Sequence, residues 1–352
     1  MQRGATENSP SSRFDSPGRE ADGDWQDWAG AHEDLPPLRT TVTIERPKSA
    51  LTRNDSPDIP FDRSFNAYRG CEHGCIYCFA RPTHAYHGLS PGLDFESRLF
   101  AKPDGPALLR AAFARPSYRP EVLAMGTNTD PYQPIEARFR ITRAVLELCA
   151  ETGHPVAITT KSDRILRDLD LLAGLAAHGL LFVMLSVTTC DPALARAMEP
   201  RAATPNRRLA AIRQLADAGI PVAVSASPMI PALNDHELEA ILEAAAAAGA
   251  RHAAAIPIRL PHEVAPLFAA WLETHLPDRK ARVLAAIRAM RGGRLNDPGF
   301  GTRMKGEGEW ARLLAQRLAK AKARFGLDAS PPPLRKDLFA RPAADPRQPL
   351  LF

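Results

Sequence analysis

Short apolar runs alternate with helical patterns through the middle of the chain. The runs contain Val and Ile, are apolar on both faces and are bounded by Gly or Pro, as buried parallel strands are. They predict strands at residues 121–126, 155–160, 180–188, 220–227 and 252–258. Apolar residues at helical spacing predict helices at about 137–152, 163–177, 204–218 and 234–248.

The order of these elements indicates an α/β fold with a parallel sheet and right-handed crossovers. Ser162 and Asn234 are expected to cap helices at their amino ends, and glycines to end them, at Gly153, Gly179, Gly219 and Gly249. The pattern alone fits both an open doubly wound sheet and a barrel. In either fold the chemistry lies at the carboxyl ends of the strands.

Both ends of the chain lack this periodicity. Residues 1–45 are rich in Ser, Pro, Asp and Gly and are expected to form a disordered acidic tail. Residues 328–352 contain six prolines and are expected to form a second, extended tail. Between them we expect a core domain over residues 46–275 and a basic helical extension over residues 276–327.

Charge is spread unevenly along the chain. Residues 1–38 carry eight acidic and three basic side chains, whereas residues 279–324 carry thirteen basic and three acidic ones. Such a basic block is typical of a nucleic-acid contact, although a solvated helix face has the same composition. Basic residues recur there at helical spacing and predict one phosphate-facing stripe, formed by Arg312, Arg317, Lys320 and Arg324.

The sequence also bears on location. Its first twenty residues contain no apolar run resembling a signal sequence. No later segment reaches the ~18–20 apolar residues of a membrane span. We therefore expect a cytoplasmic protein, in which five cysteines do not form a disulfide framework.

Three of the five cysteines, Cys71, Cys75 and Cys78, lie within the segment NAYRGCEHGCIYCFA. Thiolates are the usual ligands of iron–sulfur clusters, and this spacing lets one short loop wrap a cubane. Three ligands leave one iron of a four-iron cluster open to the amino and carboxylate groups of a methionine moiety. Gly70 and Gly74 permit the tight turns that such a loop requires.

Two other metal sites fit the same cysteines. A structural zinc ion needs a fourth ligand, which His73, His84 or His87 would supply. A structural iron–sulfur cluster is the second alternative. Against zinc, the cysteines directly precede a series of strand–helix units and do not form a self-contained finger.

The Cys-x3-Cys-x2-Cys spacing, with Tyr77 before the last cysteine, resembles the signature of the radical S-adenosylmethionine (SAM) superfamily. Over about residues 61–260, the segments NAYRGCEHGCIYC, NTDPYQPIE, ITTKS and SPMIPALND are similar to spore photoproduct lyase and its relatives. The resemblance implies a partial (β/α)6 TIM-type barrel and a [4Fe-4S] cluster on the three cysteines, with Tyr77 beside the adenine of SAM. It also implies that a reductase supplies an electron and that SAM yields a 5′-deoxyadenosyl radical, which abstracts hydrogen from the substrate.

Polar residues follow the predicted strands and are candidates to bind SAM. We expect the SAM ammonium group to contact Asn128, Thr129 and Asp130, and its ribose to contact Ser186. Lys161 and Arg201 are expected to bind a carboxylate, and Ser225 ends a further strand at the same edge. A single polar residue at such a position is most often a turn or a cap, so the prediction depends on all strand ends being polar together.

One feature of the lyase branch is missing. The lyase has a hydrogen-donating cysteine near the end of its second strand, and the comparable residues here, Ala124–Thr127, include none. Cys149 falls in a helical pattern and is expected in the core. Cys190 follows the strand predicted at 180–188 and is a candidate catalytic residue. The branch is therefore predicted, while the reaction stays open.

The chain ends in Gln348-Pro349-Leu350-Leu351-Phe352, which resembles the peptide by which bacterial DNA repair proteins bind the sliding clamp. Together with the basic block, it favours a radical SAM enzyme that repairs or modifies DNA or RNA. One alternative is a radical SAM enzyme with a small-molecule or protein substrate. The other is a non-catalytic cluster or zinc module that binds nucleic acid.

Overall fold

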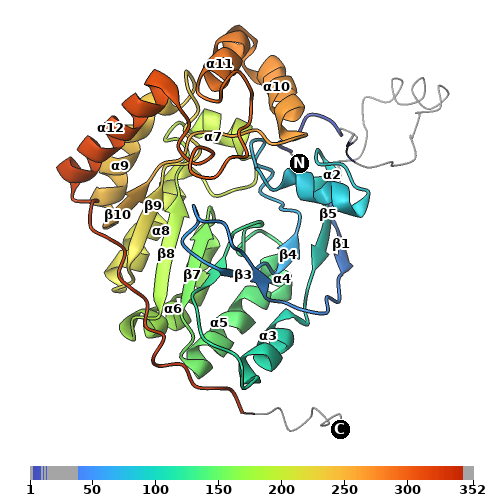
Figure 1. Ribbon diagram of the computed structural model, residues 1–352, viewed down its shortest axis with the longest axis vertical. Helices are drawn as coiled ribbons and strands as arrows, with labels where there is room; N and C mark the ends of the chain where they lie inside the picture. The colour runs from blue at the N-terminus through green and yellow to red at the C-terminus, as the bar shows by residue number, and fades with distance from the viewer. Residues whose placement is uncertain (1–2, 9–10, 12, 14–38, 344–352) are drawn as a thin grey trace, which may run out of the picture.

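The computed structural model describes residues 3–8, 11, 13 and 39–343 (Figure 1). At its centre is a seven-stranded sheet in which six strands are parallel and follow one another in chain order. The parallel strands are β3 (Arg63–Phe65), β6 (Leu123–Met125), β7 (Val156–Thr160), β8 (Leu181–Ser186), β9 (Val222–Ser225) and β10 (His252–Ala254). A doubly wound sheet reverses its order at a switch point. The unbroken order therefore confirms the expected partial (β/α)6 barrel, with β2 (Thr52–Arg53) antiparallel at one edge.

Helices cover the outer face of the sheet (Figure 1). They are α3 (Gly105–Ala114), α4 (Glu136–Phe139), α5 (Ile141–Thr152), α6 (Leu169–Ala177), α8 (Pro205–Asp217), α9 (Leu238–Ala247) and α12 (Gly308–Phe325). A further helix, α7 (Pro192–Met198), lies beyond the carboxyl ends of the strands, where Trp271 donates to the carbonyl of its Ala197 at 3.1 Å. Three 3-10 segments join them: η1 (Arg81–His87), η2 (Asp163–Asp168) and η3 (Asp235–Glu237). Two further helices, α10 (Val264–His275) and α11 (Pro277–Ala289), pack against each other beyond the carboxyl ends of the strands (Figure 1).

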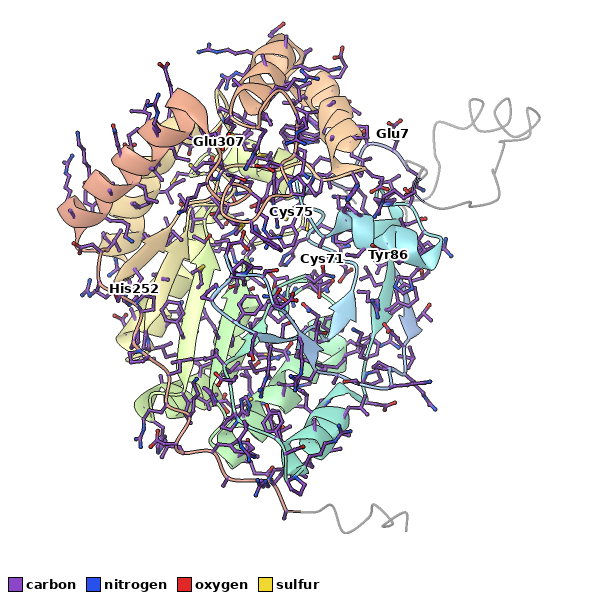
Figure 2. The ribbon with its side chains drawn as sticks, viewed as in Figure 1. Glu7, Cys71, Cys75, Tyr86, His252 and Glu307 are labelled. Carbon is purple, nitrogen blue, oxygen red and sulfur yellow. The ribbon has the colours of Figure 1, made fainter. Side chains whose placement is uncertain are left out.

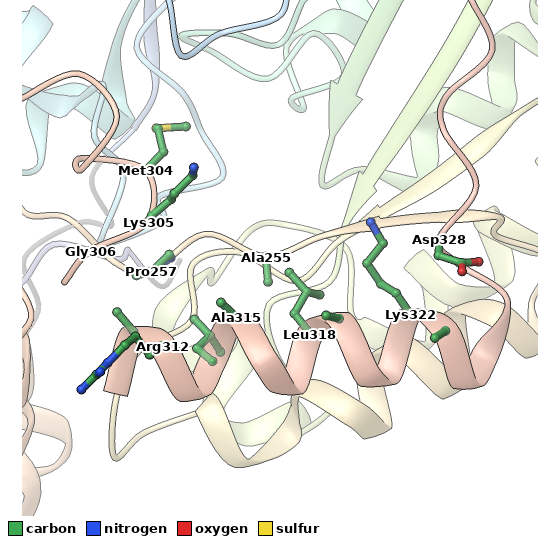
Figure 3. A pocket seen from close by; sticks show the side chains of 14 residues that line it. Ala255, Pro257, Met304, Lys305, Gly306, Arg312, Ala315, Leu318, Lys322 and Asp328 are labelled. Atoms are coloured by element: carbon green, nitrogen blue, oxygen red, sulfur yellow. The ribbon is translucent and has the colours of Figure 1, made fainter. Parts of the chain in front are cut away.

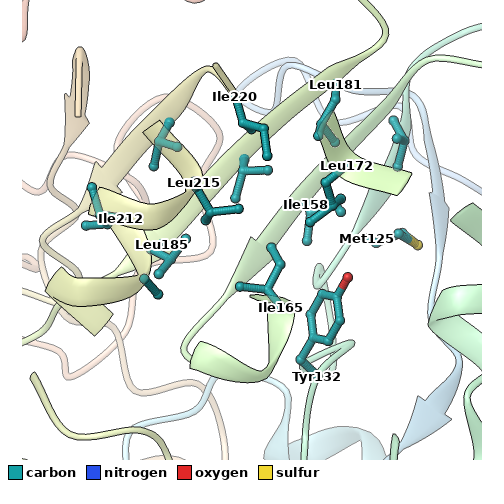
Figure 4. Close-up of a cluster of buried hydrophobic side chains, with 14 of the residues drawn as sticks. Met125, Tyr132, Ile158, Ile165, Leu172, Leu181, Leu185, Ile212, Leu215 and Ile220 are labelled. Carbon is teal, nitrogen blue, oxygen red and sulfur yellow. The ribbon is translucent and has the colours of Figure 1, made fainter. Parts of the chain in front are cut away.

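The main core lies between the sheet and these helices (Figure 4). Ile158 and Leu181 from the strands meet Leu172 of α6, while Ile212 and Leu215 of α8 cover the next part of the sheet (Figure 4). All five are fully buried. Each such side chain contributes about 1.5–3 kcal/mol of hydrophobic stabilisation, so these apolar runs define the barrel. No helix in the described ranges combines the length and the apolar character needed to cross a bilayer.

Local signals in the sequence placed most boundaries within a few residues. The four glycines expected at helix ends all have positive φ, between +61° at Gly153 and +103° at Gly249. Ser162 caps η2 by accepting the N–H of Arg164 at 3.2 Å. Asn234 does not cap its helix, because its amide bridges the N–H of Ile230 and the carbonyl of Thr188 instead.

Parts of both expected tails belong to the fold. A small sheet has the order β1 (Thr41–Ile44), β5 (Arg98–Ala101) and β4 (Tyr68–Arg69), so the first of these strands lies inside the segment expected to be disordered. At the other end, Leu338 and Phe339 pack against the core, and Ala340 donates to the carbonyl of Thr152 at 2.9 Å. Apolar anchors thus fix this Pro-rich segment. Most of the predicted acidic tail lies outside the described residues.

Candidate active site

The three cysteines lie on the loop that follows β4, at the carboxyl ends of the barrel strands. Figure 2 shows Cys71 and Cys75 near one another beside this edge. The loop is hydrogen-bonded to the end of α7, where Ile76 donates to the carbonyl of Met198 at 3.0 Å. Gly70 and Gly74 have φ values of +73° and +69°, a conformation that favours glycine, so both expected turns are present.

A buried ion pair supports the loop from below. Arg81, fully buried, donates to the carbonyl oxygens of Cys75 at 2.8 Å and Gly74 at 3.0 Å, and pairs with Glu96 at 2.5 Å. Glu96, also fully buried, accepts the main-chain N–H groups of residues 4 and 5 at 2.9 and 2.8 Å. Sequence reasoning missed this support, because neither Arg81 nor Glu96 belongs to a recognisable motif.

The amino-terminal segment packs directly on the cysteine loop. A Cβ on Gly4 would lie 1.6 Å from the carbonyl oxygen of Gly74, so only glycine fits there. Arg3 donates to the carbonyl of Glu96 at 2.6 Å. Residues 3–5 therefore form an amino-terminal strap over one side of the loop.

The donor set fits a cluster better than a single zinc ion. In the described part of the chain, no three His, Cys, Asp or Glu side chains converge on one ion-sized point. A mononuclear site requires such convergence, whereas a four-iron cubane takes each cysteine on a different iron. Nε2 of His84 donates to the carbonyl of Arg98 at 2.9 Å, and His73 faces Asp130 at 3.4 Å, so both histidines have other partners.

The surroundings of the Cys71 and Cys75 thiols favour a positively charged metal centre. Burial, nearby carboxylates and the neighbouring cysteines raise the pKa of the Cys71 and Cys75 thiols. Thiolates in such surroundings need a metal centre to compensate their charge. The residues present therefore fit a [4Fe-4S] cluster held by Cys71, Cys75 and Cys78, which would supply the electron for SAM cleavage.

Asp130 ties the cysteine loop to two strand ends. Its carboxylate accepts the hydroxyl of Thr160 at 2.7 Å and the N–H of Lys161 at 2.8 Å, and it faces His73. Burial alone would raise the pKa of the Asp130 carboxyl, but the charge and hydrogen bond of His73, with the hydrogen bonds from Lys161 and Thr160 at the end of β7, lower it to about 2. Asp130 lies at the predicted place, and its oxygens already have protein partners.

Tyr77 belongs to a second buried network. Its hydroxyl contacts Glu199 and lies 3.2 Å from the hydroxyl of Thr188, which itself donates to Glu199 at 2.7 Å. Arg208, almost fully buried on α8, pairs with the other oxygen of Glu199 and donates to the carbonyl of Ser186 at 3.1 Å. This pair was not predicted as part of the site, and it locks the ring of Tyr77 beside the cysteines.

Lys161 is a cation at this edge that remains available. Its ammonium lies 5.9 Å from the centre of the Tyr77 ring, and its charge opposes the rise in the pKa of Cys75. Within the described ranges it has no ion pair, so it is placed to meet an incoming carboxylate. The hydroxyl of Ser186 likewise has no hydrogen bond to a described residue, whereas Ser225 donates to Ser227 at 3.0 Å.

Arg201 is placed differently from the prediction. Its guanidinium pairs with Glu72 at 2.8 Å and donates to Thr40 at 3.4 Å, instead of standing free for a carboxylate of SAM. Its main-chain N–H bonds the carbonyl of His73 at 3.3 Å. Arg201 therefore holds the cysteine loop from the side, while the second oxygen of Glu72 is buried without a described partner.

Two other candidates are held by a residue that the sequence did not single out. Asn66 accepts the main-chain N–H groups of Asn128 at 3.0 Å and Thr129 at 3.3 Å. The hydroxyl of Thr129 donates to the carbonyl of Tyr68 at 3.2 Å, which leaves the side chain of Asn128 as the more available group. Asn66 thus fixes the turn after β6 at the strand ends.

The two cysteines outside the loop differ in exposure. Cys149 is fully buried on α5, in the core as predicted. Cys190 is half-buried just after β8, and its N–H donates to Glu237 at 2.7 Å. Its burial and the charge of Glu237 raise the pKa of the Cys190 thiol. Its catalytic role stays a prediction.

Comparisons with known proteins point to the same chemistry. The profile of the Radical SAM superfamily matches residues 65–245. An uncharacterized protein of Mycobacterium tuberculosis is 38% identical over 238 residues, which cover 67% of this chain and 70% of that protein. An uncharacterized protein of Methanocaldococcus jannaschii is 29% identical over 172 residues, covering 49% of this chain and 62% of that protein.

A solved structure of spore photoproduct lyase complexed with dinucleoside spore photoproduct superposes with a TM-score of 0.57 and 15% identity. The match covers 81% of this chain and 79% of the lyase chain, and at this identity it shows a shared fold. Since the family profile spans just over half of the sequence and the cysteines lie at the strand ends, the chain belongs to the radical SAM superfamily and is a radical SAM enzyme that uses a [4Fe-4S] cluster and SAM.

Proposed function

We propose that this radical SAM enzyme acts on nucleic acid, in repair or modification. The observation that carries the proposal is a cavity of about 670 Å³ between α12 and the segment that follows β10 (Figure 3). Its lining includes Ala255 and Pro257, directly after the last barrel strand, and extends to Asp328, which bridges His252 at the beginning of that strand. Its volume is in the range of pockets that take a molecule of nucleotide size.

The lining of the cavity combines an apolar floor with cations. Small and aliphatic residues of α12, among them Leu314 and Leu318, form the floor. Lys305 and Lys322 stand at opposite ends of the cavity (Figure 3). Arg312 lines the cavity near the amino-terminal end of α12. None of these three cations has an ion pair within the described ranges. A base and sugar on the floor, with phosphates at the cations, would match this arrangement.

The predicted basic stripe on α12 is only partly available. Arg317 pairs with Glu239 of α9 at 2.5 Å, and this contact anchors the helix to the barrel. Arg312 lines the cavity, whereas Lys320 and Arg324 do not. The nucleic-acid contact proposed here therefore uses the cavity instead of the whole helical stripe.

Spore photoproduct lyase, which shares the fold, has been solved with a dinucleoside lesion, and this supports nucleic acid as the substrate class. The lesion-reversal route of that lyase is not proposed here, because Ala124–Thr127 contains no cysteine. We also propose a cytoplasmic location, since reduced thiols and a reducible cluster suit a reducing compartment. A reductase and the sliding clamp remain proposed partners, and residues 348–352 lie outside the described residues.

Nucleic-acid binding by the cluster-loaded enzyme tests the proposal. We expect labelled DNA or RNA to bind with an affinity that falls steeply with salt. A variant with Lys305→Gln, Arg312→Gln and Lys322→Gln is expected to reduce the slope of log affinity against log salt by about two, at ~0.7 per lost single-strand phosphate contact. Arg317→Gln, whose guanidinium is already paired, is the matched control and is expected to keep the slope.

The reaction itself is tested with deuterated substrate. Separate anaerobic incubations with ultraviolet-damaged DNA, intact DNA and RNA are expected to transfer deuterium to 5′-deoxyadenosine with one of them. Absence of salt-sensitive binding to any nucleic acid would reject the proposal and favour a small-molecule or protein substrate.

A further inference from the structure

An exposed aromatic ring lies directly beside the cluster-binding cysteines. Phe79 follows Cys78 in the chain and is 47% exposed, although it is a large apolar side chain. The guanidinium of Arg259, from the segment after β10, lies over its ring at 4.8 Å. A cation over a ring holds the ring in place while one of its faces remains open to a planar partner.

A second pair of the same kind lies nearby. Phe300 is 59% exposed, and the guanidinium of Arg303 lies over its ring at 4.8 Å. Arg303 is fixed by a bidentate ion pair with Asp58, at 2.6 and 2.7 Å. Burial and the charge of Arg303 lower the pKa of the Arg259 guanidinium, so the two guanidinium groups are close enough to repel each other.

Arg259 differs from Arg303 in its partners. It is half-buried, and it makes neither an ion pair nor a hydrogen bond with any residue in the described ranges. The carboxylate of Asp58 favours the charged form of Arg259 through space, but it is already paired with Arg303. A partly desolvated cation without an anion of its own is costly. An anionic group placed beside Arg259 would offset that cost, which is a property expected of a phosphate site.

The two aromatic pairs continue into the basic cavity. Arg259 lies two residues after Pro257, and Arg303 lies two residues before Lys305; both Pro257 and Lys305 line the cavity. The surface formed by the cavity and the two aromatic pairs reaches Phe79 at its other end, next to the cysteine loop. A single strand lying along this surface would pass from the cavity to the edge at which the cysteines lie.

We propose that Phe79, Arg259, Phe300 and Arg303 form a stacking mouth that binds an unpaired nucleotide, with the base against an exposed phenyl ring and its phosphate at Arg259. This inference rests on the proposed function and adds to it the substrate class, single-stranded or locally opened nucleic acid. Stacking on an aromatic ring requires a base whose face is free, and the bases inside a duplex cover one another's faces.

Binding of a short labelled single strand and of the matching duplex, across a range of salt concentrations, tests the stacking mouth. Phe79→Ala is expected to weaken single-strand binding about 5- to 150-fold with an unchanged salt slope, because a stacking contact carries no charge. Phe79→Trp keeps a ring and is expected to retain binding. Arg259→Gln is expected to lower the slope by about 0.7, the value for one single-strand phosphate.

Two matched controls leave the four residues of the mouth unchanged. Tyr86 is an exposed aromatic residue on η1 with Arg13 over its ring at 5.5 Å, so Tyr86→Ala removes the same kind of pair from outside the mouth residues. Arg251 precedes β10, at the opposite edge of the sheet from Arg259, and Arg251→Gln removes one exposed charge there. Both variants are expected to bind the single strand like the unaltered enzyme.

The possible results separate the two proposals. If the unaltered enzyme binds no nucleic acid, the proposed function and the stacking mouth both fail. If it binds with salt sensitivity but Phe79→Ala behaves like Tyr86→Ala, or duplex binds as tightly as single strand, only the stacking mouth fails. Iron content is measured for every variant. Should Phe79→Ala lose the cluster, Phe79→Leu and Arg259→Gln decide the outcome.

Discussion

The two edges of the barrel are built from different kinds of contact. At the carboxyl edge, the pairs Arg81–Glu96 and Arg208–Glu199 place four charges at no more than 2% side-chain exposure around the cysteine loop. At the amino edge, aromatic rings meet instead. The ring of His154 stacks on Phe113 at 4.3 Å, and Phe339 closes the group edge-on.

The two kinds of contact serve different purposes. The ring packing at the amino edge stabilises the fold, whereas the ion pairs at the carboxyl edge fix the position of the cysteine loop. A buried ion pair adds little net stability, because desolvation cancels most of the attraction, but it fixes its partners closely. Ring packing stabilises without that cost. Burial lowers the pKa of His154 to about 4, so the histidine is neutral and behaves as one more ring. The carboxyl edge thus gives up stability to hold a loop in place.

The largest effect expected from this contrast concerns the cysteines at the two edges. Cys75→Ala at the carboxyl edge is expected to abolish formation of 5′-deoxyadenosine from SAM under reducing conditions, because one iron loses its ligand. Cys149 on α5, near His154, has no such role, and Cys149→Ala is expected to keep activity and iron content. An active Cys75→Ala variant, or an inactive parent with a filled cluster, would contradict the assignment.

The second effect concerns the ion pair beneath the loop. Arg81→Gln is expected to lower the free energy of unfolding by about 3–5 kcal/mol, since it leaves Glu96 charged and buried without its partner. Urea unfolding measures this change. Lys280→Gln, which breaks an exposed pair with Glu273, is the control and is expected to cost less than about 1 kcal/mol.

A double variant sharpens the same point. Arg81→Leu with Glu96→Leu is expected to recover part of the stability but not SAM cleavage, because the carbonyls of Gly74 and Cys75 lose their common donor. Full activity in this variant would show that the pair serves stability alone.

The smallest effect concerns pH and the amino edge. The folded-state pKa of His154, about 4, lies below the ordinary value of 6.5. The neutral His154 ring therefore makes its full contribution to the free energy of unfolding above pH 6.5. This contribution, about 3 kcal/mol in total, is lost as the pH falls toward 4. His84, with a pKa also lowered to about 4 by burial, contributes in the same window.

His154→Phe is expected to flatten the dependence of unfolding free energy on pH in that window by about half, leaving the share of His84. Urea unfolding at several pH values between about 4 and 7 measures the slope. An unchanged slope would mean that His154 is not held neutral at the amino edge.

The sequence was sufficient for most of the barrel and for the family to which the chain belongs. Five of the six parallel strands were predicted because each is an apolar run between Gly or Pro. The first, β3, was not predicted because Arg63-Ser64-Phe65 is short and two of its three residues are polar. The family was predictable because three cysteines within eight residues form a local motif, and their role as cluster ligands stays a prediction.

The contacts that hold the site residues in place could not be predicted from such local motifs. Glu199 and Arg208 look like ordinary helix-end residues until the fold buries them against Tyr77. Arg201 was assigned to SAM because guanidinium groups suit carboxylates, and the structure gives it a carboxylate of the protein, Glu72. A sequence indicates which groups are charged, whereas their partners depend on segments brought together by folding.

The strap formed by residues 3–5 has a consequence for how the enzyme is made. Its anchor, Glu96, lies 92 residues further along the chain than Gly4, so the strap is synthesised first and docks only after the whole loop has left the ribosome. During that interval the cysteines lack this cover.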